Sequence, residues 1–252
     1  MSLVERIAHG PIVELKLARP PVNALDPVLC NDLRVALADA VRDGAQGIVL
    51  SGGPKVFSAG LDVPFLLGLG EDRIALHAAW EAFFGTARAL AECPVPLAAA
   101  LAGHAPAGGC VLALCCDYRV MAEGPYRIGL NETQVGLVAP EGIQHLMRRI
   151  VGPQRAERLL VGGEMIDAAR AHAIGLVDEL AGIDEVTTRA RVWLEALLAL
   201  PRQPVLQTRA IARADVVAAL QPDMIRLDRF VDAWAAPDTQ AGLKALMAQL
   251  GK

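Results

Sequence analysis

The sequence predicts an α/β domain followed by a helical region at its C-terminal end. In the first half of the chain, short strand-like segments alternate with helices, and in the second half helical segments crowd together. The chain has 252 residues, of which 54% are hydrophobic, and a mean hydropathy of +0.37. A chain of this length and composition buries a sizeable core and is not intrinsically disordered.

The first predicted elements are a strand, a long helix and a second strand. Residues 11–18 alternate apolar and polar side chains, as half-buried strands do, and the turn-rich connector RPPVNAL follows. Asp26 stands where an N-cap is expected, with Pro27 at the first helical position. Apolar residues then recur at helical spacing until Gly44, which ends the helix, and GIVLSG at 47–52 predicts a short buried strand.

The middle of the chain predicts another helix and another buried strand. The helix covers about 72–92, Pro94 and Pro96 end it, and PLAAALAG at 96–103 is the strand. Residues 110–116 are apolar on every side, which predicts a buried helix at the centre of the molecule. The remaining predictions are a strand at 117–122, helices at about 141–150, 153–161 and 167–173, and three long helical segments after residue 183.

Charge and cysteine content restrict the partners and the compartment. The formal net charge is −4 with both signs dispersed, so we expect neither nucleic acid nor a membrane as a partner. The five cysteines fit no metal-binding spacing, and Cys110, Cys115 and Cys116 lie in an apolar run, so we interpret them as reduced core residues. No apolar run reaches transmembrane length, and MSLVERIAHG resembles neither a signal nor a transit peptide. We expect a cytoplasmic protein without a metal site; a presequence removed upstream stays an open alternative.

Two loops rich in small residues are candidates for contact between backbone and ligand. They are FSAGLD at 57–62 and GHAPAGGCV at 103–111, and the second opens the buried helix. Unpaired N–H groups in such loops can bind developing negative charge. The alternative is that Gly108 and Gly109 only allow the helix to pack tightly. Neither loop matches the phosphate-binding P-loop or the dinucleotide fingerprint.

Glu132 is the only acid in the stretch IGLNETQVGLVAP at 128–140. Apolar residues flank it, and the stretch contains no Lys or Arg to pair with its carboxylate. Burying an unpaired carboxylate is costly and disfavours its ionised form, which raises its pKa toward the range useful for proton transfer. Glu132 is therefore a candidate general base, and the two loops are candidates for an oxyanion hole.

The segments FSAGLD, PAGGCVLALCCDYRV and IGLNETQVG together resemble the crotonase (enoyl-CoA hydratase/isomerase) superfamily. The resemblance extends over nearly the whole chain. It implies a spiral core of ββα units at 1–190 with an acyl-CoA site, and a C-terminal helical oligomerisation region at 191–252 that forms homotrimers or dimers of trimers. It also implies that an acyl-CoA thioester is the substrate, that its enolate is held by two backbone N–H groups, and that no separate cofactor is needed.

Residue by residue, the resemblance assigns roles to both loops. It places one oxyanion N–H at Leu61 and the other at Gly108. It places Ala59 and Asp62 around the CoA adenine, although Asp62 has the alternative role of capping the next turn. Lys55 faces a CoA phosphate in one interpretation and is an ordinary solvated lysine in the other.

Two positions indicate the subclass. Hydratases of the family carry one glutamate at the position of Glu132 and a second at the position of Val111. In this chain the second position is a valine, whose apolar side chain is expected to line the substrate site. One base without a water-holding acid suits a proton shift, and the motifs resemble the mitochondrial-type Δ3,Δ2-enoyl-CoA isomerase branch. We expect isomerisation of 3-enoyl-CoA to trans-2-enoyl-CoA in the β-oxidation of unsaturated fatty acids. The alternatives are a hydratase, another enolate-forming crotonase, or a non-catalytic acyl-CoA-binding subunit.

Overall fold

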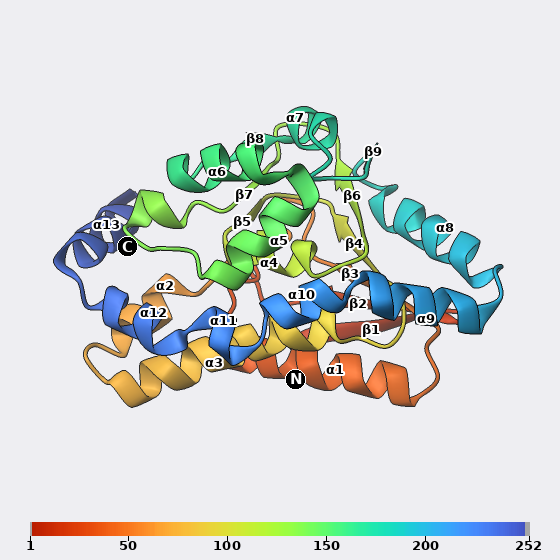
Figure 1. The fold of residues 1–252 in the computed structure, drawn as a ribbon, viewed down its shortest axis with the longest axis horizontal. Helices are drawn as coiled ribbons and strands as arrows, with labels where there is room; N and C mark the ends of the chain where they lie inside the picture. Colours follow the sequence, from red (N-terminus) through yellow and green to blue (C-terminus); the bar gives the residue numbers. More distant parts are fainter. Residues whose placement is uncertain (1, 250–252) are drawn as a thin grey trace.

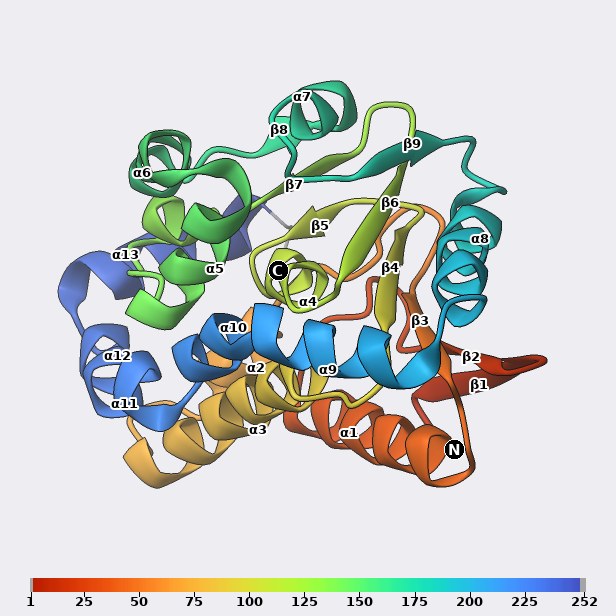
Figure 2. The same ribbon diagram turned by 45° about the vertical axis from the view of Figure 1, so that its right-hand side comes forward.

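A six-stranded mixed sheet lies at the centre of the fold in the computed structural model, which describes residues 2–249. Strand β1 is antiparallel to β2, and each following pair is parallel. Helix α8 lies along one side of this sheet, and α12 and α13 lie at the opposite end of the molecule (Figures 1 and 2). In order across the sheet, the strands are β1 (Val4–His9), β2 (Ile12–Leu17), β3 (Gly47–Ser51), β4 (Leu97–Leu101), β6 (Tyr118–Ala122) and β9 (Glu179–Ala181).

The alternation of side chains along each strand gives the sheet two apolar faces. Ile12, Val49 and Ala98 point to one face, where they pack with Ala190 and Leu194 of α8. The opposite face packs against α1, α3 and α4 in the larger core cluster. A parallel strand covered on both faces is apolar at every position, which explains why β3 and β4 are buried throughout.

A small second sheet brings two distant segments of the chain together. Strand β5 (Ala105–Pro106) pairs in parallel with β7 (Arg127–Gly129), which pairs antiparallel with β8 (Ile166–Asp167). Ala105 lies opposite Ile128, and Pro106 lies opposite Gly129. Because parallel strands leave the sheet at the same edge, the start of α4 after β5 and the segment after β7 lie side by side.

Most of the predicted helices in the first half are confirmed. Asp26 caps α1 by accepting from the N–H of Leu29 at 2.8 Å, and Asp72 caps α3. The central buried helix begins at Gly108, two residues before the predicted start. The helices are α1 (Pro27–Arg42), α2 (Val63–Gly68), α3 (Arg73–Ala91), α4 (Gly108–Leu114), the 3-10 helix η1 (Glu132–Val135), α5 (Glu141–Val151), α6 (Pro153–Gly162), α7 (Ala168–Ala173), α8 (Val186–Leu198), α9 (Arg202–Ala212), α10 (Ala214–Ala219), α11 (Pro222–Ile225), α12 (Leu227–Trp234) and α13 (Pro237–Gln249).

The second half of the chain differs from the prediction in two respects. Strands β7, β8 and β9 were not predicted and lie between the predicted helices, because runs of two or three residues carry no detectable period. The three long segments after residue 183 are six shorter helices, and prolines at or just before their starts divide them at α9, α11 and α13. Residue 190 lies inside α8, and the division there into core and oligomerisation region stays a prediction.

No helix within residues 2–249 is long and apolar enough to cross a membrane.

Candidate active site

The two glycine-containing loops lie in direct contact. A Cβ added to Gly60 would lie 3.0 Å from the amide nitrogen of Gly108, and one added to Gly108 would lie 3.3 Å from the Cα of Gly60. Gly109 approaches the other loop as well, because a Cβ there would lie 2.5 Å from the carbonyl oxygen of Ser58. The glycines that the sequence placed in separate motifs therefore allow one close backbone-to-backbone contact.

The connector between β2 and α1 fixes the first loop in place. The Leu25 N–H donates to the Gly60 carbonyl at 2.7 Å, and the Leu25 carbonyl accepts from Asp62 at 3.1 Å. The Ser58 hydroxyl donates to the carbonyl of Asn23 at 2.8 Å and accepts from the Gly60 N–H at 3.2 Å. Leu61 thus sits in a rigid turn with its neighbours on both sides hydrogen-bonded.

The amide groups of Leu61 and Gly108 are available to a ligand. Within residues 2–249, neither of these two N–H groups donates to a protein acceptor. Both residues line the same cavity. Ala107 lines it as well, and its φ of 45° turns the chain into α4. Two free N–H groups from touching loops have the arrangement that an oxyanion hole requires.

The cavity has a volume of about 530 Å³ and a mainly apolar lining. It is lined by the three residues predicted to be catalytic, Glu132, Leu61 and Gly108, and by Val111, which was predicted to line the substrate site. The lining comes from the two loops, from η1 and α5, and from α3, α12 and α13. Its residues include Arg19, Pro20, Pro21, Val22, Ala24, Ala59, Asp62, Val63, Leu66, Trp80, Phe83, Phe84, Asn131, Val135, Leu137, Ile143, Phe230, Trp234, Leu243 and Leu246.

Glu132 begins the 3-10 helix η1, directly beyond strand β7. Although the residue is only partly buried, its Oε2 atom is inaccessible to solvent and has no hydrogen-bond partner within the described part of the chain. Burial raises the pKa of Glu132 to about 7, and a backbone hydrogen bond within the residue offsets a smaller part of this shift. A carboxyl group of this pKa accepts and returns protons near neutral pH.

Only some of the apolar sequence neighbours of Glu132 are buried around it. Leu130 and Leu137 are buried, but Val138 is 64% exposed and points away. The Glu132 charge contributes, after burial, to raising the pKa of the buried Cys110 thiol on α4, and Gly108 and Val111 of the same helix line the cavity with Glu132. The burial of the carboxyl group therefore comes from α4 and the C-terminal helices as well as from its own segment.

Val111 lies on α4, one turn beyond Gly108, and is only 2% exposed. Among the described residues that line the cavity, only Glu132 and Asp62 carry carboxyl groups. Asp62 is already engaged: it accepts from the Phe65 N–H at 3.0 Å, capping α2, and from Arg19 at 2.7 Å. Glu132 is thus the one carboxyl group of this lining that is free to react.

Arg19 is a site residue that the sequence alone did not reveal. Its guanidinium group bridges Asp62 and Asp26, at 2.7 Å and 3.1 Å, and so joins the connector, α1 and α2 at the mouth of the cavity. Nothing in the sequence marked it, because Asp62 lies more than forty positions away. The capping role that was the alternative for Asp62 is confirmed.

The remaining predicted binding residues lie in different places. Ala59 lines the cavity. Lys55 is exposed and does not line it; its backbone carbonyl accepts from the N–H of His104. The contact of Lys55 with a CoA phosphate, and those of Ala59 and Asp62 with the adenine, stay predictions.

An aromatic wall forms the inner part of the cavity. The chain has three Trp, two Tyr and five Phe, and five of these aromatic residues line the cavity. The Trp80 ring packs edge-on against Phe230, with ring centroids 4.3 Å apart, and against Trp234 at 5.8 Å. Such contacts hold large side chains in fixed orientations. The sequence feature that hints at this wall is the spacing of Phe230 and Trp234, which are four positions apart in a chain with few aromatic residues.

Other residues near the motifs are structural. Asp117 accepts from the Leu97 N–H at 2.7 Å and pairs with Arg209 at 2.9 Å and Arg213 at 3.0 Å. His104 accepts from the backbone N–H of Arg127 and lies outside the cavity lining. All five cysteines are free and buried, and burial raises the pKa of Cys115 to about 12.

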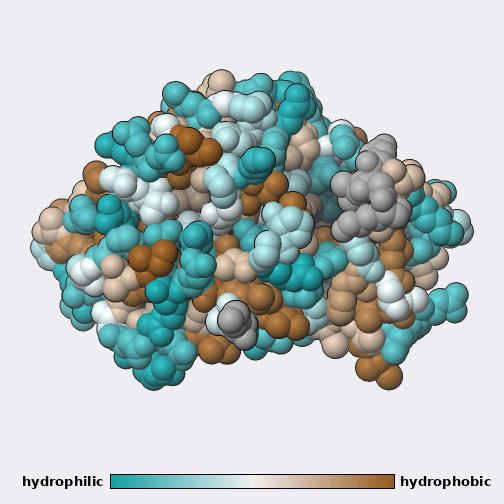
Figure 3. All heavy atoms as spheres, turned by 180° about the vertical axis from the view of Figure 1, so that it is seen from behind, coloured by the Kyte–Doolittle hydropathy of each residue, from teal (hydrophilic) through white to brown (hydrophobic). Residues whose placement is uncertain are grey.

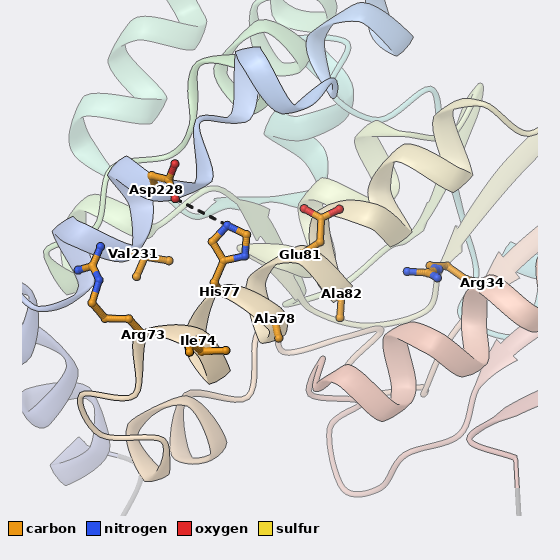
Figure 4. A pocket seen from close by; sticks show the side chains of 9 residues that line it. All are labelled: Arg34, Arg73, Ile74, His77, Ala78, Glu81, Ala82, Asp228 and Val231. Atoms are coloured by element: carbon orange, nitrogen blue, oxygen red, sulfur yellow. Dashed lines mark ion pairs between the residues drawn. The ribbon is translucent and has the colours of Figure 1, made fainter.

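A second hollow lies on the outer side of α3, between α1 and α12 (Figure 4). Its charged residues are of both signs, and four of them are paired: His77 lies 3.7 Å from Asp228, Arg73 pairs with Asp232 at 2.6 Å, and Glu81 pairs with Arg88 at 3.3 Å. The face of the molecule opposite to Figure 1 likewise mixes hydrophilic and hydrophobic residues (Figure 3). In contrast to Glu132, the carboxyl groups of this hollow are open to solvent, with side-chain exposures of 47% for Glu81 and 92% for Asp228.

Known proteins share this sequence and this fold. The chain is 37% identical over 202 residues to the mitochondrial enoyl-CoA delta isomerase 1 of Mus musculus, covering 79% of this chain and 69% of that protein. It is 32% identical over 233 residues to a probable enoyl-CoA hydratase of Mycolicibacterium paratuberculosis, covering 88% and 86%.

The structure superposes on that of human mitochondrial delta3-delta2-enoyl-CoA isomerase with a TM-score of 0.93 at 30% identity, covering 99% of this chain and 98% of the human one. This likeness confirms the crotonase-like α/β core with its C-terminal helical region. The model of the enoyl-CoA hydratase/isomerase family matches residues 8–248. The chain belongs to the enoyl-CoA hydratase/isomerase family.

Proposed function

We propose that this protein converts 3-enoyl-CoA to trans-2-enoyl-CoA by a 1,3-proton shift. The observation that carries the proposal is the single free carboxyl group, Glu132, in an apolar cavity that also contains the unpaired N–H groups of Leu61 and Gly108. Val111 occupies the position at which a second acid would hold a water molecule. The names of the mouse and human relatives support the same reaction.

In the proposed mechanism, the thioester carbonyl oxygen accepts hydrogen bonds from Leu61 and Gly108. The Glu132 carboxylate removes a proton from C2, which both the thioester and the adjacent double bond acidify. The two N–H groups stabilise the negative charge that develops on the oxygen of the dienolate. Protonated Glu132 then delivers the proton to C4, and the double bond shifts to C2–C3. These steps need no metal, flavin or nicotinamide, and the apolar lining keeps water from the dienolate.

The test is an assay with both isomers as substrates. Purified protein supplied with 3-enoyl-CoA should form the conjugated thioester, which absorbs in the ultraviolet. The same protein supplied with trans-2-enoyl-CoA should form no 3-hydroxyacyl-CoA at a comparable rate. Hydration of the 2-enoyl substrate as fast as isomerisation of the 3-enoyl substrate would refute the proposal.

Hydration is the second candidate, because a relative with 32% identity is named a probable enoyl-CoA hydratase. Against it stands Val111, which cannot hydrogen-bond a water molecule. The substrate pair above distinguishes the two reactions. A non-catalytic acyl-CoA-binding subunit would bind both substrates and convert neither.

The proposed base predicts an acidic limb in the pH profile. Burial raises the pKa of Glu132 to about 7, and the base must be ionised to act. The value of kcat/KM should therefore rise with pH, reach half its maximum near pH 7 and fall about tenfold per unit below that point. Steady-state rates between pH 5 and pH 9 measure this midpoint. A midpoint near pH 4.5 would show that the carboxyl group is solvated in the working enzyme.

We also propose that the protein assembles as a homotrimer or a dimer of trimers through its C-terminal helices. Supporting this, α9 buries none of its residues fully, and Ile211 on it is 80% exposed. Sedimentation equilibrium should give three or six times the chain mass of 26.6 kDa. A mass of 26.6 kDa at micromolar concentration would contradict the proposal.

A place in unsaturated fatty-acid β-oxidation stays a prediction, which metabolite profiling of a deletion strain would test. A cytoplasmic location also stays a prediction, which cell fractionation would test.

A further inference from the structure

The turn that carries the proposed base has little to hold it from within. Helix η1 has four residues and no side-chain cap. Its internal hydrogen bonds are backbone ones, from Gln134 to Asn131 at 3.1 Å, from Gly136 to Thr133 at 3.2 Å and from Leu137 to Glu132 at 2.9 Å. The Glu132 Oε2 atom has no partner within the described residues. The position of this carboxyl group therefore depends on the elements that pack against η1.

The C-terminal end of helix α6 packs closely on one side of the turn, since a Cβ on Gly163 would lie 2.5 Å from Thr133 Oγ1, but the hydrogen bonds there are long. The Thr133 hydroxyl donates to the Leu160 carbonyl at 3.3 Å, and the Gln134 side chain donates to the Gly162 carbonyl at 3.5 Å. Both distances are at the long end for hydrogen bonds. Thr133 and Gln134 are exposed, so water competes for both contacts.

Helix α13 holds the other side tightly, from more than a hundred residues away. The Thr239 hydroxyl donates to the carbonyl of Gly136, the residue that ends η1, at 2.6 Å. Thr239 is only 2% exposed. A Cβ on Gly136 would lie 2.8 Å from the Thr239 Cα, and one on Gly242 would lie 2.7 Å from the Val135 carbonyl carbon. Two glycines thus allow the backbones of α13 and η1 to touch.

The same face of α13 forms part of the cavity wall. Leu243 and Leu246 line the cavity, and residues 239, 242, 243 and 246 share one helical face because they are three, four and seven positions apart. One side of a single helix therefore contacts both the catalytic turn and the space for the acyl chain. Among the described residues, the hydrogen bond from Thr239 is the shortest of the side-chain hydrogen bonds between this turn and either helix.

We propose that Thr239 is a positioning residue that holds the turn of Glu132 in its reactive place through the hydrogen bond to Gly136. The inference rests on the proposed function for its kinetic consequences. The effect of Thr239 on the Glu132 carboxyl group does not depend on the proposed function, because a loosened turn admits water to Glu132 whatever reaction the protein catalyses.

The neighbouring titratable groups do not complicate this effect. The Cys110 thiol on α4 stays neutral because burial raises its pKa, with a smaller contribution from the Glu132 charge. The charged residues of the two helices that pack on η1 are all exposed: Asp238 and Lys244 on α13, and Arg155, Glu157 and Arg158 on α6. A shift in the Glu132 titration therefore reports its solvation.

The test compares Thr239→Val with Thr239→Ser. Valine keeps the volume and removes the hydroxyl, and serine keeps the hydroxyl. With Thr239→Val, we expect kcat to fall about tenfold while KM changes little, because a small displacement of a reacting group impairs the chemical step more than binding. The midpoint of the acidic limb should fall by about one pH unit as the carboxyl group becomes hydrated. Thr239→Ser should restore most of both values.

Thr86→Val is the matched control. The Thr86 hydroxyl is equally buried and donates to the carbonyls of Cys30 and Ala82, away from the cavity. This variant should lose similar stability and keep the wild-type pH midpoint. Carbon-13 NMR of the Glu132 carboxyl group, assigned with Glu132→Gln, measures the titration without activity and independently of the folded fraction. An unchanged Glu132 titration in Thr239→Val overturns the inference; a wild-type protein without isomerase activity overturns the proposed function alone.

Discussion

Replacing Glu132 with glutamine should lower kcat for 3-enoyl-CoA isomerisation by about a thousandfold, the usual scale for loss of a positioned general base. Glutamine has nearly the same shape, so the cavity should still bind acyl-CoA and KM should change little. Stopped-flow or steady-state formation of the conjugated thioester measures the loss. The residual rate reports what the two backbone N–H groups and the apolar cavity contribute without a base.

Glu141→Gln is the control, because Glu141 is an exposed acid at the start of α5 that does not line the cavity. It should retain the wild-type rate. Folding of the Glu132→Gln variant is not at risk from the charge change. Because burial raises the pKa of Glu132 to about 7, the stability that this group contributes is present at low pH and lost as pH rises through 7. Above pH 7 the glutamine variant should therefore unfold no earlier than the wild type. Full activity in Glu132→Gln would remove Glu132 from the mechanism.

The elements predicted correctly are those whose sequence carries a local signal. Asp26 followed by Pro27 marks the start of α1, and the apolar run at 97–101 marks a strand buried on both faces. Strands β7 and β9 have three residues each, and their pairing is set by partners far along the chain. No local pattern specifies such strands, so these were missed.

The residues of the active site likewise divide into those with a local sequence signal and those without one. Gly108 and Glu132 were recognisable because their types are unusual in their settings, and the structure brings them to one cavity together with Leu61. The aromatic wall and α13 were not recognisable as parts of the site, because an apolar residue at helical spacing has the same sequence pattern whether it faces a core or a substrate. The tertiary contact of Thr239 with Gly136, across 103 positions, has no sequence signal at all.

Replacing Gly60 with alanine should lower kcat by a factor of about a hundred to a thousand, the cost of losing one oxyanion donor. The added Cβ would lie 3.0 Å from the Gly108 nitrogen and 3.1 Å from the Pro106 carbonyl oxygen. Both contacts are with backbone, which cannot rotate away as a side chain can. The loops must therefore separate, and the Leu61 and Gly108 N–H groups no longer converge on one oxygen.

Gly60 also has a φ of +81°, so alanine there carries backbone strain in addition to the collision. Gly10→Ala separates the two effects, since Gly10 has a φ of +64° and nothing within 4 Å of an added Cβ. Both variants should lose stability in thermal unfolding, Gly60→Ala more because it also has the collision, but only Gly60→Ala should lose activity. A Gly60→Ala enzyme with the wild-type kcat would mean that the spacing of the two loops is not what stabilises the dienolate.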